Sequence, residues 1–395
     1  MLLLAFRYTA LLTGLFTTLL SGVVVHQVGS VGNARSSTGR NSATIDKTPR
    51  EIEERAGGFH RVIAVNKNNL WAIGLEGDGL NGSENSVILN STDSGFSWTR
   101  SLLIQHCHLD DILFQGALTG WVIGSEQERG LILHTSDGGR NWTRQRSDSR
   151  MPLWRLTFVS RTHGWITGWG GRVLRTDDGG ALWSSLRLPF GWVNDEIKAE
   201  IKDVSFADEK NGWIVGEMGR AHTSTDGGSS WEPRTPQLGQ LMRISKPWQI
   251  NFKRVSFFGK KIGAIIVEIN DKPDPSAPAS SYMRKLVILR TEDGGRNWLV
   301  RKTIETPTFV SAQFLSGDEW WVRTLSRTSL HHTTDAGKTW SEVTLTNDVI
   351  DGPVLFLDSN LGWLFSYRAG FFFDNLLTRD GGKTWTTQRI SYITS

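Results

Sequence analysis

Seven aspartates recur along the chain, each flanked by residues that could bind a cation or shape a turn. The repeated pattern is Ser or Thr, any residue, Asp, any residue, Gly, two residues, Trp; its aspartates are Asp93, Asp137, Asp178, Asp226, Asp293, Asp335 and Asp380. Calcium takes about six to eight oxygen ligands, whereas each copy offers one carboxylate and one hydroxyl. The same groups can hydrogen-bond nearby backbone atoms in a turn, with glycine at positive φ. We therefore predict a structural turn, and no metal or cofactor, at each copy.

A second set of residues combines arginine with tryptophans that the repeats do not use. Residues 129–187 contain ten arginines, no lysine and four acids. Arginine binds carboxylates through a planar fork, and Arg with Trp is common in interfaces. The candidate binding residues are Arg129, Arg146, Arg150, Arg172, Arg220, Trp154, Trp169, Trp192 and Trp248. We predict that they dock an acidic segment of a protein client, membrane proteins included; the alternative is a solvated surface with unrelated arginines.

Carboxylates raise the competing hypothesis of a glycoside hydrolase. Such enzymes use a pair of acids on either side of the scissile bond, for which Glu126, Glu217 and Asp195 are candidates. No Ser/His/Asp nucleophile motif, metal cluster or phosphate-binding loop is recognised in the sequence. We therefore predict a non-catalytic protein and keep a glycosidase as the alternative.

The elements that position these residues follow from a second repeated pattern, which precedes the first. It is an apolar alternation around Gly-Trp, as in residues 120–124, 164–168, 212–216 and 362–363. Leu70-Trp71 and Trp320-Trp321 are variants of this pattern, and the fifth repeat has Gly263-Ala264 instead. The aspartates span 287 residues in six intervals, an average of about 48 residues, which suits one four-stranded propeller blade per repeat.

Seven such units cover residues 59–395 and close a ring without unpaired edges. The prediction is an all-β, seven-bladed propeller of four-stranded antiparallel blades. Each blade contains one of the seven repeated Asp-containing turns, which we call Asp-box turns. In one unit we expect strands at residues 204–206, 213–215 and 221–223 and from residue 232 onward. Links between blades, and loops between each second and third strand, then open on one face, where the candidate arginines and tryptophans gather. Either residues 45–58 or residues 386–392 could supply a closing strand.

The N-terminal residues indicate export. Residues 1–28 are mostly apolar and are predicted to be a signal peptide or a membrane anchor, and residues 29–58 a flexible linker. We expect the protein to be periplasmic, lumenal or extracellular. We also expect it to be a monomer. The lone cysteine, Cys107, precludes an intramolecular disulfide. A formal net charge of +4 and the export signal disfavour nucleic-acid binding.

The repeated turn resembles the Asp-box, or bacterial neuraminidase repeat, of sialidases, sortilin-type receptors, xyloglucan hydrolases and photosystem II assembly and stability factors. Gly-Trp-x-x-Gly followed by the box, as in residues 211–231, repeated around one ring, is most similar to the photosystem II assembly factors. That resemblance implies a binding scaffold with an arginine patch for a membrane-protein client and a role in photosynthesis. A sialidase would instead need a tyrosine nucleophile, for which Tyr367 is the one plausible position.

Overall fold

The computed structural model describes residues 56–76, 85–145, 151–186, 188, 200–238, 249–270, 284–305, 309–324, 329–344, 352–365, 374–389 and 391–393. The chain divides into two compact units, residues 1–48 and 49–395, and every described residue belongs to the second. The expected signal peptide or anchor therefore lies outside the described residues, as does the expected linker up to residue 55. Within the described part, no helix is long and apolar enough to cross a bilayer.

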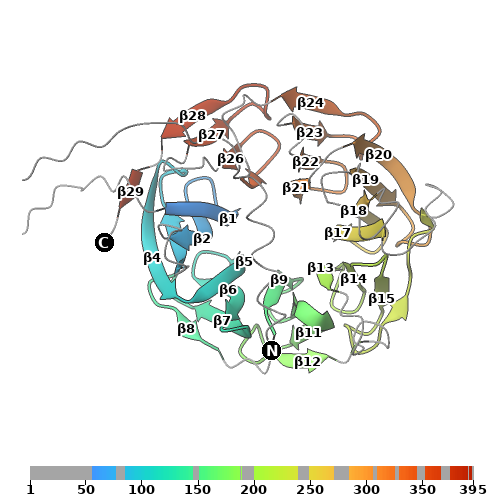
Figure 1. The fold of residues 1–395 in the computed structure, drawn as a ribbon, viewed down its shortest axis with the longest axis horizontal. Coiled ribbons are helices and arrows are strands. Elements are labelled where there is room, and N and C mark those ends of the chain that lie inside the picture. Colours follow the sequence, from blue (N-terminus) through green and yellow to red (C-terminus); the bar gives the residue numbers. More distant parts are fainter. Residues whose placement is uncertain are drawn as a thin grey trace, which may run out of the picture. The chain divides into compact units, whose positions relative to one another are not determined.

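Seven four-stranded antiparallel sheets form a ring, as Figure 1 shows. Blade one consists of β1 (Ala56–Ala64), β2 (Leu70–Glu76), β3 (Asn85–Ser91) and β4 (Ser97–Gln105). Blade two consists of β5 (Cys107–Gln115), β6 (Thr119–Glu126), β7 (Arg129–Thr135) and β8 (Thr143–Arg144). Blade three consists of β9 (Leu153–Phe158), β10 (Gly164–Gly168), the 3₁₀ turn η1 (Trp169–Gly171), β11 (Arg172–Thr176) and β12 (Ser184–Leu186).

The remaining blades repeat this order. Blade four consists of β13 (Ile201–Phe206), β14 (Gly212–Gly216), β15 (Ala221–Ser224) and β16 (Glu232–Pro233). Blade five consists of β17 (Ile250–Phe258), β18 (Ile262–Asn270), β19 (Arg284–Thr291) and β20 (Leu299–Glu305). Blade six consists of β21 (Phe309–Phe314), β22 (Trp320–Thr324), β23 (Ser329–Thr333) and β24 (Ser341–Thr344). Blade seven consists of β25 (Val354–Phe356), β26 (Gly362–Phe365), β27 (Asp374–Thr378) and β28 (Thr386–Arg389). The predicted seven-bladed propeller is confirmed, and its first strand begins at Ala56, inside the expected linker.

The ring is closed by the C-terminal end of the chain. After β28, strand β29 (Ser391–Ile393) leaves blade seven and pairs in parallel with β4 of blade one, Ser391 opposite Ser97 and Ile393 opposite Thr99. Blade one therefore has a fifth strand on its outer edge. Of the two segments considered for closure, the C-terminal one pairs with blade one, but only through its last residues, since residues 386–389 belong to blade seven.

Stacked aromatic rings join neighbouring blades. The Gly-Trp tryptophan of one blade stacks on the phenylalanine that ends the innermost strand of the next, as in Trp165 and Phe206, whose ring centroids are 3.5 Å apart. The glycine before each Gly-Trp tryptophan leaves room for that phenylalanine: a Cβ on Gly212 would lie 2.3 Å from the Phe206 ring. The Asp-box tryptophan of the same blade, Trp231, meets Phe206 edge-on. The Gly-Trp pattern thus encodes contacts between blades.

Each Asp box forms the turn between the third and fourth strands of its blade. In blade two, Thr135 Oγ1 donates to Asp137 Oδ1 at 2.8 Å and accepts the Gly139 N–H at 2.9 Å. The same carboxylate accepts the Asn141 backbone N–H and its side-chain amide. The hydrogen bonds from the Ser or Thr hydroxyl to Asp, and from the glycine N–H to that hydroxyl, recur in all seven boxes. Both oxygens of the carboxylate bond within the turn, as expected for a structural element.

Candidate functional site

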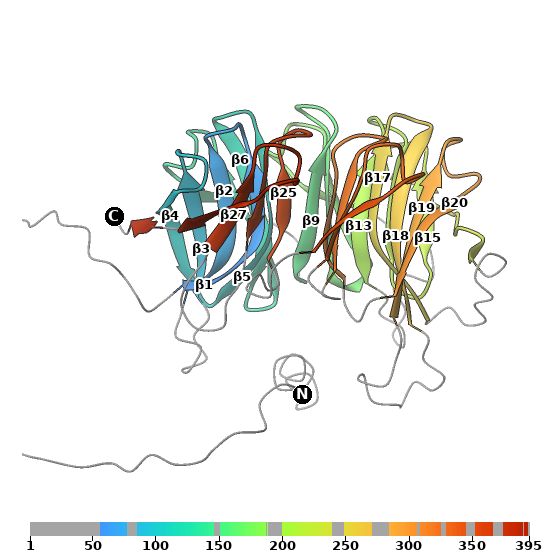
Figure 2. The same ribbon diagram turned by 90° about the horizontal axis from the view of Figure 1, so that it is seen from above.

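The antiparallel order of each blade divides the propeller into two faces. We call the face that carries the inter-blade links and the loops between second and third strands the link face. The face that carries the Asp-box turns is called the turn face. Figure 2 shows the strands of the propeller running between these two faces. In blade three, Leu153 pairs with Gly168 and Gly168 with Arg172, which places all three at the link face.

Three of the predicted arginines lie at the link face, in three successive blades. Arg129 begins β7 opposite Glu126 and is exposed. Arg172 begins β11, is half-buried and donates to Ser185 Oγ at 2.8 Å. Arg220 lies in the loop before β15, where its carbonyl accepts the Gly216 N–H. The topology therefore brings these three residues to one face.

Two of the predicted tryptophans lie on the same face. Trp169 begins the turn between β10 and β11, and Trp154 is the second residue of β9, next to the link that precedes this strand. Both are half-buried. The ring of Trp154 lies 5.8 Å from Lys202 Nζ of blade four. The other predicted binding residues, Arg146, Arg150, Trp192 and Trp248, lie outside the described residues.

The innermost strands line a central cavity of about 540 Å³. In five of them a β-bulge near the link face is followed by a charged residue that lines this cavity: Arg61, Asp111, Arg155, Asp203 and Arg254, in blades one to five. A bulge adds one residue to a strand and re-aims the side chains beside it. The result is an arc of alternating positive and negative side chains.

The two aspartates of this arc tie neighbouring blades together. Asp111 Oδ2 accepts the Leu156 N–H of blade three at 3.0 Å, and Asp203 Oδ2 accepts the Val255 N–H of blade five at 3.0 Å. Arg155 lies between the two carboxylates, 3.6 Å from Asp111 and 3.3 Å from Asp203. Burial lowers the pKa of Arg155, but the two carboxylates outweigh this effect and raise it above its ordinary value.

Sequence reasoning missed this arc, although a signal for it exists. Each charged residue stands ten positions before the Gly-Trp tryptophan of its blade, as in Arg61 and Trp71 or Asp111 and Trp121; in blade five, Arg254 stands ten before Ala264. Serine and proline occupy the same position in blades six and seven, as Ser311 and Pro353. Aligning the repeats on that position therefore identifies the five charged residues that line the central cavity.

The candidate glycosidase acids at the link face already have cationic partners. Glu126 forms a bidentate pair with Arg144, whose Nη2 lies 2.8 Å from Oε1. This hydrogen bonding lowers the pKa of Glu126, the opposite of what a general acid needs. Glu217 lies 3.1 Å from Lys202 Nζ. Asp195 and Tyr367 lie outside the described residues, which hold no cluster of three or more metal-ligating side chains.

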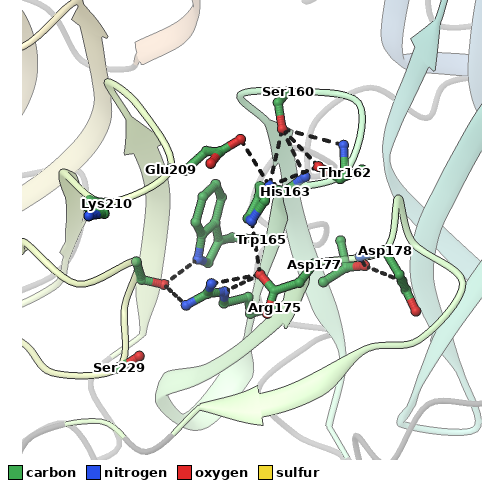
Figure 3. Close-up of polar contacts among 12 residues, drawn as sticks. Ser160, Thr162, His163, Trp165, Arg175, Asp177, Asp178, Glu209, Lys210 and Ser229 are labelled. Atoms are coloured by element: carbon green, nitrogen blue, oxygen red, sulfur yellow. Dashed lines mark hydrogen bonds and ion pairs between the residues drawn. The ribbon is translucent and has the colours of Figure 1, made fainter.

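A polar cluster of the turn face joins blades three and four (Figure 3). His163 Nδ1 lies 3.1 Å from Glu209 of the next blade, and His163 Nε2 lies 3.5 Å from Asp177. Arg175 pairs with Asp177 and also donates to the Gly227 carbonyl, which accepts the Trp165 indole N–H as well. These contacts link one Asp-box turn to the neighbouring blade and have a structural role.

A sequence model of the family described as "Photosynthesis system II assembly factor YCF48" matches residues 76–155, 185–268 and 282–356. These segments make up more than half of the chain. The chain belongs to the YCF48 family. The predicted resemblance to photosystem II assembly factors is therefore confirmed, although no curated protein matches the sequence.

Solved structures show the same fold at low sequence identity. A structure described as YCF48 bound to D1 peptide is 17% identical, with a TM-score of 0.54, and the match covers 88% of this chain and 98% of that one. YCF48 from Cyanidioschyzon merolae is 16% identical, with a TM-score of 0.55 and coverages of 84% and 98%. A GH74 xyloglucanase from Xanthomonas campestris is 14% identical, with a TM-score of 0.59, over 88% of this chain but only 55% of the enzyme.

Proposed function

We propose that this YCF48-family propeller is a non-catalytic scaffold that docks an acidic segment of a protein client on the link face of blades two to four. The observation that carries the proposal is the gathering of Arg129, Arg172, Arg220, Trp154 and Trp169 at one end of three adjacent blades. Arginine supplies planar donors for carboxylates, and half-buried tryptophan supplies rigid apolar area, which together are typical of binding hot spots.

Two further observations support this role. A family member binds D1 peptide, according to the description of its structure, so the family fold can hold a peptide. The link-face acids Glu126 and Glu217 are engaged by Arg144 and Lys202, which reduces the repulsion that an acidic segment would meet there. The same pairing deprives a glycosidase mechanism of free carboxylates at these positions. We further propose that the protein is exported and that its client is a membrane protein.

The direct test is peptide binding to the purified chain. Fluorescence anisotropy would be measured with a labelled D1 peptide, with an acidic peptide, and with that peptide's Gln/Asn counterpart. Charge reversal of Arg129, Arg172 and Arg220 to Glu is expected to raise the Kd for the acidic peptide by at least tenfold. Each lost charge-assisted hydrogen bond is worth about 1.5–3 kcal/mol.

Turn-face arginines provide the matched control. Arg140, Arg296 and Arg379 are exposed and belong to Asp-box turns, so their reversal to Glu changes the net charge by the same amount without touching the link face. This control variant should bind the acidic peptide as the unaltered chain does. Equal binding by the link-face variant, or hydrolysis of xyloglucan or a sialoside by the unaltered chain, would refute the proposal. Circular dichroism checks that both variants are folded.

A further inference from the structure

The Asp-box turn of blade three carries an exposed leucine at a position where the other boxes have a hydrogen-bond donor. In those six boxes a Ser, Asn or Thr four residues after the aspartate donates its side chain to the second carboxylate oxygen: Ser97, Asn141, Ser230, Asn297, Thr339 and Thr384. Leu182 occupies this position in blade three and supplies Asp178 with its backbone N–H alone. Leu182 is 73% exposed, the largest value among the large apolar residues of the described part of the chain. The turn therefore does not need this side chain.

A second exposed leucine lies in the turn between β5 and β6 of blade two. Leu118 is 61% exposed, and its carbonyl accepts the N–H of Gly138 in the Asp box of the same blade. In the other six blades the same backbone hydrogen bond is made by residues with polar or charged side chains: Asn68, Thr162, Lys210, Lys261, Asp318 and Asn360. Since the backbone alone makes this bond, the fold does not require an apolar side chain here either.

The two leucines belong to adjoining turns at the junction of blades two and three. Gly180 stands two residues before Leu182, and a Cβ on it would lie 2.6 Å from Trp121 Nε1 of blade two. Trp121 in turn stands three residues after Leu118. Single apolar residues scattered over a surface are normal, whereas apolar residues gathered together indicate a contact surface. Two leucines on adjoining turns, at positions that are polar in the other blades, therefore favour a contact with another molecule.

A cation and a carboxylate accompany the leucines on this face. Arg161 lies in the turn between β9 and β10, which Gln115 of blade two joins through a 2.9 Å hydrogen bond to a backbone carbonyl. Arg161 is exposed and forms no ion pair with another described residue. His163 of the same turn lies 3.1 Å from Glu209 of blade four, whose side chain is still 53% exposed (Figure 3). We call Leu118, Leu182, Arg161 and Glu209 the leucine surface.

A second copy of the chain fits the leucine surface. A two-fold symmetric interface brings the same surface of both copies together, so it must be complementary to itself. The leucine surface meets this condition, because its apolar residues can bury one another while its cation faces the carboxylate of the other copy. An anionic bilayer fits less well, since the seven Asp-box carboxylates lie on the same face and repel anionic headgroups.

We propose that two copies of the chain form a dimer through the turn faces of blades two and three. Leu118 and Leu182 lie at its centre, and Arg161 pairs with Glu209 of the partner subunit. The contact area is small, so the association should be reversible and depend on concentration. Both link faces stay exposed, so the dimer neither requires nor prevents peptide docking. It replaces the monomer expected from the sequence.

Sedimentation velocity of the full-length chain over a wide range of concentrations tests the association. A shift from monomer to dimer with rising concentration is expected. The variant L118N/L182S, whose new residues are those of other blades at the same positions, should raise the dimer Kd at least about tenfold. L299S removes a leucine that is 53% exposed from β20 of blade five and should leave the Kd unchanged. A chain that is monomeric at every concentration, or an unchanged Kd in L118N/L182S, would overturn the proposal.

A charge exchange tests which residues meet in the dimer. R161E and E209R each place like charges opposite one another and should raise the Kd at least about threefold. The double variant R161E/E209R restores opposite charges and should return the Kd toward that of the unaltered chain. Losses that simply add in the double variant would refute the pairing. Circular dichroism checks that all three variants are folded.

The thermal stability of L182S separates a role in association from a role within the blade. Serine at this position restores the side-chain donor to the Asp-box carboxylate that the other six boxes have, so the Tm of the monomer should stay equal or rise. A lower Tm of L182S would give the leucine a role in holding the turn and would contradict the proposal.

Discussion

Trp320 of blade six fills the space that Ala264 of blade five leaves open. At the six other junctions a Cβ on the Asp-box glycine would lie within 4 Å of the preceding blade's Gly-Trp tryptophan, as Gly180 faces Trp121. At the junction of blades five and six, Gly337 instead faces Trp320, from its own blade, with a Cβ contact of 3.0 Å. Both Ala264 and Trp320 are fully buried in one cluster. Trp320, which stands where the Gly-Trp pattern has glycine, is therefore a core residue.

This exchange predicts a compensating pair of substitutions. W320G should destabilise the protein by about 3–5 kcal/mol because it opens a large cavity, and A264W should destabilise it by overpacking, about 1–3 kcal/mol. The double variant A264W/W320G restores the pattern of the other blades and should recover most of the loss. Urea unfolding monitored by far-UV circular dichroism measures the stability of the unaltered chain, the two single variants and the double variant. Strictly additive losses would contradict the exchange.

A second prediction concerns the glycine of the Gly-Trp pattern. G212A should lower the free energy of unfolding by about 1–3 kcal/mol, because its Cβ would lie 2.3 Å from the Phe206 ring. The same change at Gly317, whose Cβ would meet Ile262 at 3.1 Å, is the milder control. If both variants unfold at the same urea concentration as the unaltered chain, Phe206 is not what requires glycine at position 212.

Arg155, which is half-buried in the central cavity, gives a third prediction. R155M should destabilise the fold by about 3–5 kcal/mol, because it leaves two buried carboxylates without their shared cation. R175M, on the turn face, removes a pair to the exposed Asp177 and a hydrogen bond to the Gly227 carbonyl, and should cost about 1–2 kcal/mol. A thermal-unfolding comparison of the two variants tests this order, and a smaller effect of R155M would contradict it.

A fourth prediction is that protonation of the Asp-box carboxylates lowers the stability of the fold at acidic pH. Hydrogen bonds from Asn141 and Thr135 lower the pKa of Asp137 to about 2, and hydrogen bonds from Thr384 do so for Asp380. A carboxyl whose pKa is lower in the folded state stabilises it above the unfolded value, near 4, and loses that contribution as the pH falls toward 2. Tryptophan fluorescence followed from pH 6 to pH 2 should show loss of stability in this window. Asp380→Asn should weaken the pH dependence of the stability. A stability of the unaltered chain that does not change below pH 4 would contradict the prediction.

Removal of the closing strand should loosen the ring. Deletion of residues 390–395 removes β29 from the edge of β4 and should cost about 1–3 kcal/mol, at about 0.5–1.5 kcal/mol for each net hydrogen bond. Hydrogen exchange should show the loss in β4 of blade one rather than evenly around the ring. Unchanged exchange in residues 97–105 would mean that β29 does not hold the ring closed.

Much of the propeller could be predicted from sequence because its repeats are local. The Asp box forms its hydrogen bonds within seven residues, so the seven turns follow from the pattern alone. The Gly-Trp tryptophan marks the second strand of every blade except blade five, which has Ala264 at that position. The link-face position of Arg129, Arg172 and Trp169 also followed, since strand order determines the face on which each loop opens. Their role in binding remains a prediction.

What the sequence determined by itself was therefore the number of blades, their strand order and the position of each turn. The tertiary structure decided which residues meet across blades. Arg61 and Arg254 are far apart in the chain, and they share a cavity only because the ring closes and a bulge turns each toward its axis. That Trp320 of blade six fills the volume beside Ala264 of blade five could not be predicted from the repeats for the same reason. The two residues share one core between blades, whereas a sequence repeat describes one blade at a time.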